Sequence, residues 1–359
     1  MKKYLALLLC VVLLFSVAAC AKSGDSAESP AAEEPSTESP AAEEPAGEEP
    51  GGDSANGGSK KVAGVVFQED QFMKLLQLGY RVAAEEAGYE FYPANTNGDA
   101  AKEVEFLNTY VTQGFAGVAI SPISEEASLE PLRNAANAGL VIALSNSNLG
   151  SEEWMVACYT SDNYQLGNFT GQACANYIKE KLGGKAKIGI LQYKSLLPEQ
   201  SGQRYQGFID ALKDLDGVEI VADQDAWMQD KAITVAGDIL TSNPDIDILW
   251  AANEGGTVGA AMAIKNAGLA GKVVAFGTDA SEQTINLLQD EDNVLQAVTG
   301  QDPYNIGIMT MKALIAELEG GFDQKGETII VPGVVLTREK PDEIEEFKQD
   351  LMEKIKMAN

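Results

Sequence analysis

The 359-residue chain contains no histidine, only four cysteines and little positive charge. Without histidine it cannot form a Ser-His-Asp or Cys-His catalytic group, and every metal site with an imidazole ligand is excluded. Lysine and arginine number 26 against 54 acidic residues, which gives a formal net charge of −28. Nucleic acids are bound largely through basic contacts with phosphates, so this balance argues against a nucleic-acid partner and against an anionic membrane surface.

Two of the cysteines, Cys158 and Cys174, lie beyond residue 20. They lack the Cys-x-x-Cys spacing of zinc sites. Cys158 lies in an apolar run and Cys174 in a pattern of helical spacing, which favours two buried thiols. A disulfide stays open at this level, since a protein outside the cytoplasm can oxidise its thiols.

Two pairs of neighbouring carboxylates are the remaining candidates for catalysis. Glu69-Asp70 and Asp342-Glu343 have the residue types that glycoside hydrolysis uses. The second pair precedes a charged helical run, Glu345 to Lys356, which is typical of a surface helix. We therefore expect a chain that is not an enzyme and that needs neither a cofactor nor a metal ion.

A long apolar run begins the chain. Tyr4 to Phe15 follows a basic start, and the run ends in Val17-Ala18-Ala19-Cys20, the layout of a secretory signal. It resembles the signal of bacterial lipoproteins, whose cleavage site ends on a cysteine after small residues. The resemblance implies a signal peptide over residues 1–19 and lipidation of Cys20. The lipid would hold the protein on the extracytoplasmic face of the bacterial cell membrane. A plain signal peptide or an uncleaved anchor is the alternative.

Residues 20–59 have the composition of a disordered linker. Proline recurs at every fifth position from Pro30 to Pro50, and ten acidic residues face one lysine. Apart from proline, no apolar side chain between Cys20 and Ser59 is larger than alanine. Such a segment cannot bury a core, and its flexible reach is ~35 Å. The signal carries a charge of +2 and the linker −9, so residues 60–359 carry −21 of the total.

The remaining 300 residues alternate between short apolar strands and amphipathic helices. The predicted strands are 61–67, 89–95, 114–123, 140–146, 187–192, 218–221, 246–251, 273–277 and 294–298. Asp99 is placed to cap a helix that runs to Gln113, and Glu125 to Ala138 forms another. The alternation predicts an α/β fold with doubly wound parallel sheets, and the length predicts two lobes.

In such sheets, ligands bind at the carboxyl ends of the strands. Polar residues follow the predicted strands at Gln68 to Gln71, Ser145-Asn146, Asn253-Glu254, Thr278-Asp279 and Gln301-Asp302. Three of them, Asp70, Asn253 and Asp279, also suit helix N-caps. The polar positions therefore predict a binding site at the strand ends.

Lys60 to Val335 is similar to the periplasmic binding proteins for monosaccharides, of the ribose-binding type. The matching pieces are TSDNYQLG, RYQGFIDAL, SNPDIDILWAANEGGTVGA, GTD and QDPYNIG, in this order. The resemblance implies two similar lobes joined by three crossovers, with a ligand cleft between them. The N-terminal lobe would comprise residues 60–161 plus 302–333, and the C-terminal lobe residues 162–301 plus 334–359.

Carried over by position, the resemblance implies nine ligand-binding residues. They are Asp70, Phe72, Ser145, Asn146, Arg204, Trp227, Asn253, Asp279 and Gln301. Asp70 stands where the family has an asparagine, and Ser145-Asn146 where it has an Asp-Arg pair. Met73 replaces the second of two aromatic residues. These departures leave the choice among a pentose, a hexose, a polyol and a deoxy sugar open.

The residue types suit a sugar. Carboxylates, amides and a guanidinium hold hydroxyls that both donate and accept, and Phe72 and Trp227 could sandwich the C–H faces of a ring. The resemblance implies a monomer that captures a sugar or polyol and delivers it to an ABC permease and its ATPase. Two alternatives stay open. One is a sugar sensor that docks a chemoreceptor or a histidine kinase; the other is a nucleoside-binding lipoprotein.

Overall fold

The computed structural model describes residues 59–147, 149–150 and 152–358. The predictions for residues 1–58, namely the signal peptide, the lipidation of Cys20 and the acidic linker, lie outside this part of the chain. Within it, no helix combines the length and the apolar character that crossing a membrane requires.

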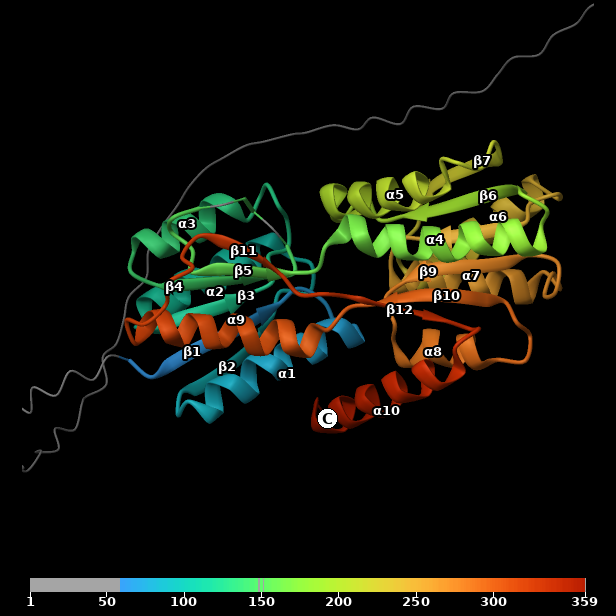
Figure 1. The fold of residues 1–359 in the computed structure, drawn as a ribbon. Helices are drawn as coiled ribbons and strands as arrows, with labels where there is room; N and C mark the ends of the chain where they lie inside the picture. The colour runs from blue at the N-terminus through green and yellow to red at the C-terminus, as the bar shows by residue number, and fades with distance from the viewer. Residues whose placement is uncertain (1–58, 148, 151, 359) are drawn as a thin grey trace, which may run out of the picture. The chain divides into compact units, whose positions relative to one another are not determined.

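The first of two six-stranded sheets is parallel throughout (Figure 1). Its order is β11-β5-β4-β3-β1-β2. The strands are β1 (Lys61–Val66), β2 (Glu90–Asn95), β3 (Gly117–Ile120), β4 (Val141–Ser145), β5 (Ala157–Thr160) and β11 (Glu327–Ile330). Because β11 comes from far along the chain, the first sheet is completed only after the chain has formed most of the second sheet.

The second sheet repeats this plan in the order β12-β10-β9-β8-β6-β7. Its strands are β6 (Lys185–Gln192), β7 (Gly217–Asp225), β8 (Ile248–Ala251), β9 (Val274–Thr278), β10 (Leu295–Gly300) and β12 (Val334–Thr337). All of its pairs are parallel except β10 with β12, which is antiparallel. The two lobes therefore differ in the direction of one edge strand.

Helices cover both faces of each sheet (Figure 1). The first sheet packs against α1 (Gln71–Glu86), α2 (Ala100–Thr112), α3 (Leu129–Asn137) and α9 (Pro303–Leu318). The second packs against α4 (Asn163–Lys181), α5 (Pro198–Leu212), α6 (Gln229–Ser242), α7 (Glu254–Asn266) and α8 (Glu282–Gln289). The C-terminal helix α10 (Pro341–Ala358) contacts α1, α8 and β12, and so touches both lobes.

Alternation along the strands creates these two-sided cores. In β8, Trp250 joins the cluster with α4 and α5, whereas its neighbour Leu249 joins the one with α6 and α7. In β1, Val62 and Ala63 divide in the same way between the two faces of the first sheet. Successive side chains of a strand point to opposite faces, so strands apolar at every position are buried on both sides.

The predicted two-lobed α/β fold with three crossovers is confirmed. The chain passes between the sheets at residues 161–162, 301–302 and 331–333. The short strands β5, β11 and β12 were not among the predicted ones. The helix predicted from Glu125 begins at Leu129 instead. Ser124 Oγ accepts hydrogen bonds from the backbone N of Glu126 and Ala127, which holds residues 125–128 in turns.

The two cysteines beyond residue 20 are buried free thiols, as the sequence favoured. Cys158 Sγ donates to the backbone O of Ser147 at 3.3 Å. Burial raises the pKa of the Cys158 thiol to about 12 and that of the Cys174 thiol further still. Both side chains therefore act as small apolar groups of the core.

Candidate functional site: a cleft between the lobes

A cleft of about 590 Å³ lies between the two lobes. The first lobe contributes residues 67–73, at the start of α1, and Asn146 after β4. The second lobe contributes residues from α5 and from the carboxyl ends of β6, β7, β8 and β9. The volume lies within the range of small-molecule sites, and the place follows the rule for parallel sheets.

Asp279 is the centre of the polar network in the second lobe. Its carboxylate accepts hydrogen bonds from Gln301 Nε2 at 2.5 Å, from the backbone N of Glu254 at 3.2 Å and from Arg204 Nη1 at 3.3 Å. Asp279 follows β9 with a left-handed φ of 71°. The helix cap expected as an alternative is taken by Ser281 instead. Asp279 thus links the N-terminus of α7, the crossover at residues 301–302 and Arg204 of α5.

Arg204 is almost fully buried, with 3% of its surface exposed. Nε donates to Asn163 Oδ1 at 2.9 Å, and Nη1 donates to the backbone O of Ala252 at 2.8 Å. The guanidinium carbon lies 5.3 Å from the centre of the Tyr193 ring. Although burial opposes the charge, Tyr193 and Asp279 hold the pKa of Arg204 above its usual value. The side chain is therefore a fixed cation of the cleft wall.

Two glycines bring Arg204 to this position. A Cβ on Gly167 of α4 would lie 1.8 Å from the backbone O of Arg204, and one on Gly207 of α5 would lie 2.0 Å from that of Tyr164. Only glycine permits such a close approach of two helix backbones. The contact sets Arg204 beside Asn163, the first residue of α4.

Asn253 and Trp227 meet at the other side of the second-lobe wall. Asn253 is the N-cap of α7 and accepts from the backbone N of Gly256 at 3.2 Å. Its Nδ2 donates to the backbone O of Trp227 at 3.1 Å. Gly255 makes room for this contact, since a Cβ there would lie 2.2 Å from the same oxygen. The cap residue therefore also fixes the backbone that carries the indole.

The first lobe contributes fewer fixed groups. Asp70 caps α1 by accepting from the backbone N of Met73 at 2.8 Å, and it also accepts from Gln68 Nε2. Asn146 has a left-handed φ of 65°, and its Nδ2 donates to Ser121 Oγ at 3.3 Å. Phe72 lines the cleft next to Asp70. Capping and a place on the cleft wall are thus combined in Asp70.

The structure brings eight of the nine predicted residues to this cleft. Ser145 is the exception: it is fully buried, its hydroxyl bonds the hydroxyl of Tyr80, and it does not line the cleft. Side chains alternate along β4, so Ser145 and Asn146 differ in direction at the strand end. The sequence placed both at the site but gave no signal for choosing between them.

The cleft wall also contains residues outside the predicted set, among them Tyr193, Gln200 and Glu254. Tyr193 directly follows β6, so the strand-end rule applied to that strand would have found it. Gln200 precedes Arg204 by four residues on α5, which places both on one face of the helix. Glu254 is the first residue of α7, next to Asn253.

Direct contacts link the lobes on either side of the cleft. Gln200 Nε2 of the second lobe donates to the backbone O of Asn146 at 2.9 Å. The backbone N of Glu282, at the start of α8, donates to Gln71 Oε1 at 2.9 Å. The lobes are therefore held together in the arrangement that the structure shows.

Two carboxyl groups of the cleft have raised pKa values. Burial raises the pKa of Asp70 to about 6, against the hydrogen bond from Met73, and the charge of Asp279 adds to the rise. Burial likewise raises the pKa of Glu254 to about 7, opposed by a hydrogen bond with Ser281 and assisted by the charges of Asp70 and Asp279. Near neutral pH both groups are close to their titration.

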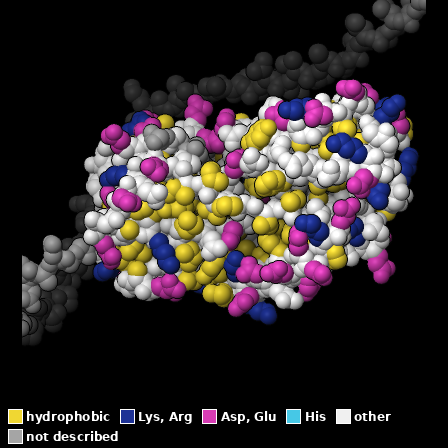
Figure 2. All heavy atoms as spheres, in the orientation of Figure 1, with side chains coloured by type: hydrophobic (Ala, Val, Ile, Leu, Met, Phe, Trp, Pro, Cys, Tyr) yellow, Lys and Arg dark blue, Asp and Glu magenta, His cyan; other side chains and the backbone are white. Residues whose placement is uncertain are grey.

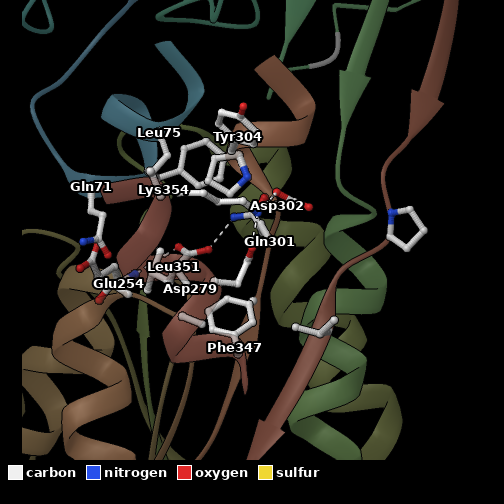
Figure 3. Close-up of a pocket in the computed structure, with 18 residues that line it drawn as sticks. Gln71, Leu75, Glu254, Asp279, Gln301, Asp302, Tyr304, Phe347, Leu351 and Lys354 are labelled. Carbon is white, nitrogen blue, oxygen red and sulfur yellow. Dashed lines mark hydrogen bonds and ion pairs between the residues drawn. The ribbon is translucent and has the colours of Figure 1, made fainter. Parts of the chain in front are cut away.

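A smaller cavity of about 200 Å³ adjoins the cleft beside α10 (Figure 3). Gln71, Glu254, Asp279 and Gln301 line both spaces, and Phe347 and Leu351 of α10 add an apolar wall. Its volume is below the usual range for a small-molecule site. The larger cleft is therefore the candidate site.

Outside the cleft, the surface carries no basic patch on the face in Figure 2. Apolar side chains gather there over α9, and acidic ones along α10. No cluster of three or more potential metal-ligating His, Cys, Asp or Glu residues occurs within the described ranges.

Comparison with known proteins identifies the family. The pattern of the periplasmic binding protein domain matches residues 64–321. The "ABC transporter periplasmic-binding protein YphF" of Escherichia coli is 28% identical, and the match covers 72% of this chain and 81% of that protein. The "D-allose-binding periplasmic protein" of Escherichia coli is 26% identical, with 69% and 82% covered.

Solved structures have the same fold. A solute binding protein of an ABC transporter from Bacillus halodurans, with bound myo-inositol, has a TM-score of 0.72 and 20% sequence identity. The superposition covers 82% of this chain and 99% of that one. Since the family pattern spans most of the described residues and the fold agrees, the chain belongs to the periplasmic binding protein family.

Proposed function

We propose that the chain captures a monosaccharide or a polyol in the interlobe cleft and delivers it to an ABC importer. The observation that carries the proposal is the cleft wall, where a buried guanidinium, carboxylates, amides and two aromatic residues from both lobes surround a space of sugar size. The relatives support it, because one is named for D-allose binding and one was solved with myo-inositol. Like the other members of the periplasmic binding protein family, the chain is a binding protein and not an enzyme.

Eight residues are proposed to contact the ligand, namely Asp70, Phe72, Asn146, Arg204, Trp227, Asn253, Asp279 and Gln301. Polar groups among them would bind hydroxyls through charge-assisted hydrogen bonds, while the aromatic residues would cover apolar faces of the ring. The moving units would be residues 60–161 plus 302–333 and residues 162–301 plus 334–359. Ligand binding would stabilise the closed arrangement, because only that arrangement contacts the ligand from both lobes.

A calorimetric screen of pentoses, hexoses, deoxy sugars, polyols and purine nucleosides tests the proposal. We expect a sugar or a polyol to bind with a Kd near 1 µM, or ~8 kcal/mol. Absence of binding by every sugar and polyol would refute it. Selective binding of a nucleoside would favour the nucleoside-binding alternative, in which Phe72 and Trp227 stack a base.

We also propose that the protein is a monomeric lipoprotein, anchored through Cys20 to the extracytoplasmic face of the cell membrane. The small residues before Cys20 and the acidic, proline-rich segment after it support this. In cell fractionation, the full chain should stay with the membrane and a Cys20→Ala variant should lose its lipid. Equal acylation of both chains, measured by mass spectrometry, would contradict the anchor.

A further inference from the structure

The charges that line the cleft do not balance. Among its described lining residues, five are acidic and one, Arg204, is basic. The acidic residues are Glu69, Asp70, Glu254, Asp279 and Glu282. Glu69 and Glu282 are exposed, whereas Asp70, Glu254 and Asp279 are partly buried. A sugar without charge would leave the excess among these three uncompensated, and an unpaired charge is costly where water is partly excluded.

The one guanidinium is already committed to Asp279. Arg204 Nε donates to Asn163, and Nη1 donates to the backbone O of Ala252. Nη1 also forms the ion pair with Asp279, at 3.3 Å. No hydrogen bond of Nη2 occurs within the described part of the chain, so this buried side chain keeps a donor for a ligand hydroxyl. Arg204 therefore neutralises one acidic residue and leaves the others.

Asp70 and Glu254 have no cationic partner among the residues that the structure describes. The lysine that acts on Asp70, Lys74, lies 3.8 Å from Glu69. Lys354, which shares the smaller cavity with Glu254, pairs with Asp350 at 2.8 Å and with Asp302 at 3.5 Å. Figure 3 shows Lys354 beside Asp302.

The two acidic groups without a cationic partner line the cleft from opposite lobes. Asp70 is the N-cap of α1 in the first lobe, and Glu254 is the first residue of α7 in the second. The negative charges of Asp70 and Asp279 both raise the pKa of Glu254, after burial, which contributes most. A cation bound between the lobes would relieve this repulsion and would bridge them.

We propose that the ligand carries a positive charge, as an amino sugar or another polyhydroxylated amine does, and that Asp70 and Glu254 bind its ammonium group. This inference rests on the proposed function and specifies its substrate class. The hydroxyls of the same ligand would use Arg204 Nη2 and the amides, and Trp227 or Phe72 would offer a π face to the ammonium or to the ring.

Matched pairs of probes test the charge alone. Glucosamine, galactosamine and mannosamine are titrated at pH 7 against their parent sugars and their N-acetyl derivatives, which share stereochemistry but lack the charge. We expect at least one amine to bind ten-fold or more tightly than both uncharged partners. Glu254→Gln and Asp70→Asn should each lower the affinity for that amine about ten-fold more than they lower the affinity for the parent sugar. Asparagine caps helices as well as aspartate does, so α1 should be preserved.

Glu180→Gln is the control, because Glu180 is an exposed acidic residue of α4 outside the cleft. It should leave all affinities unchanged. If a parent sugar binds as tightly as its amine, or if the two cleft variants weaken both equally, the inference is overturned while the proposed function stands. If no amine, sugar or polyol binds, the proposed function itself fails, and this inference with it.

Discussion

The two lobes share one plan but equip the cleft differently. The second lobe supplies Arg204, Asp279 and Asn253. Arg204 bonds to Asp279, and each of the three also forms a hydrogen bond with a backbone group of the same lobe. The first lobe supplies Asp70, held by local capping bonds, and Phe72. One wall is therefore preorganised, and the other is assembled from the end of a single helix and a strand end.

This difference indicates an order of events. A preorganised wall binds at a lower entropic cost, because fewer side chains are immobilised when the ligand arrives. We infer that the ligand binds first to the second lobe and that the first lobe then closes over it. The effects of substitutions should differ accordingly between the two walls.

Substitution of Arg204 by methionine should have the largest effect. It removes a ligand donor and leaves the partly buried Asp279 without its cation, which costs about 3 kcal/mol of stability. Calorimetry should show a loss of affinity of roughly 100-fold, and urea unfolding the loss of stability. Arg133→Met, which breaks ion pairs with Glu130 and Glu152 at the surface, should cost less than about 1 kcal/mol. Equal effects of the two substitutions would contradict a fixed second-lobe wall.

Substituting the two aromatic residues compares the contributions of the two cleft walls to affinity. Trp227→Ala should lower sugar affinity by about 2 kcal/mol, roughly 30-fold, and Phe72→Ala by about 1 kcal/mol. The effect of Trp227 should be larger because Asn253 holds the backbone of Trp227 in place. Titration calorimetry measures both. A larger loss for Phe72→Ala would reverse the inferred order of the lobes.

The acidic residues on the two walls predict a dependence of stability on pH. Asp70 and Glu254 have folded pKa values of about 6 and about 7, above the values near 4 of unfolded chains. The folded state therefore binds more protons, and their contribution to stability is full below about pH 4 and is lost as the pH rises to about 7.

A double variant, Asp70→Asn with Glu254→Gln, should not lose stability in this way as the pH rises, because neither side chain titrates. Without ligand, its melting temperature should exceed that of the parent protein by ~4 °C at pH 8, or roughly 1–2 kcal/mol, and the difference should shrink towards pH 5. Differential scanning calorimetry at both pH values measures it. A difference that grows at pH 5 would mean that the two carboxyls are stabilised as anions.

Ser145→Ala should have the smallest effect. Sugar affinity should change less than about two-fold, while stability falls by about 1 kcal/mol because the buried hydroxyl of Tyr80 loses its partner. The double variant with Tyr80→Phe should recover part of that loss. A large loss of affinity in Ser145→Ala would place this residue in the binding wall after all.

The sequence predicted the fold well because its signals are local. Apolar runs bounded by glycine and helix caps define most strands and helices, as Asp99 does for α2. The strands β5, β11 and β12 have four residues each, and β11 and β12 are only partly buried, so their apolar pattern is weak. What they pair with depends on distant segments, which a local pattern does not contain.

The site was predictable where position along a strand determines it. Asp279 directly follows β9, and Asn253 lies two residues after the last residue of β8, so the strand-end rule finds both. The contact of Arg204 with Asn163 depends on the close approach of α4 and α5, and the charge excess around Asp70 and Glu254 depends on both lobes. These features arise only when segments far apart in the chain meet.

Spin labels on the two lobes test directly whether the ligand is held between them. Cys158 and Cys174 are buried. In a chain with Cys10 and Cys20 replaced by serine, cysteines at the exposed positions of Glu126 in the first lobe and Gln203 in the second can therefore be labelled selectively. With the best ligand of the screen at saturation, the distance distribution between the labels should shift to shorter values and become narrower. An identical distribution with and without that ligand would contradict capture by closure of the lobes.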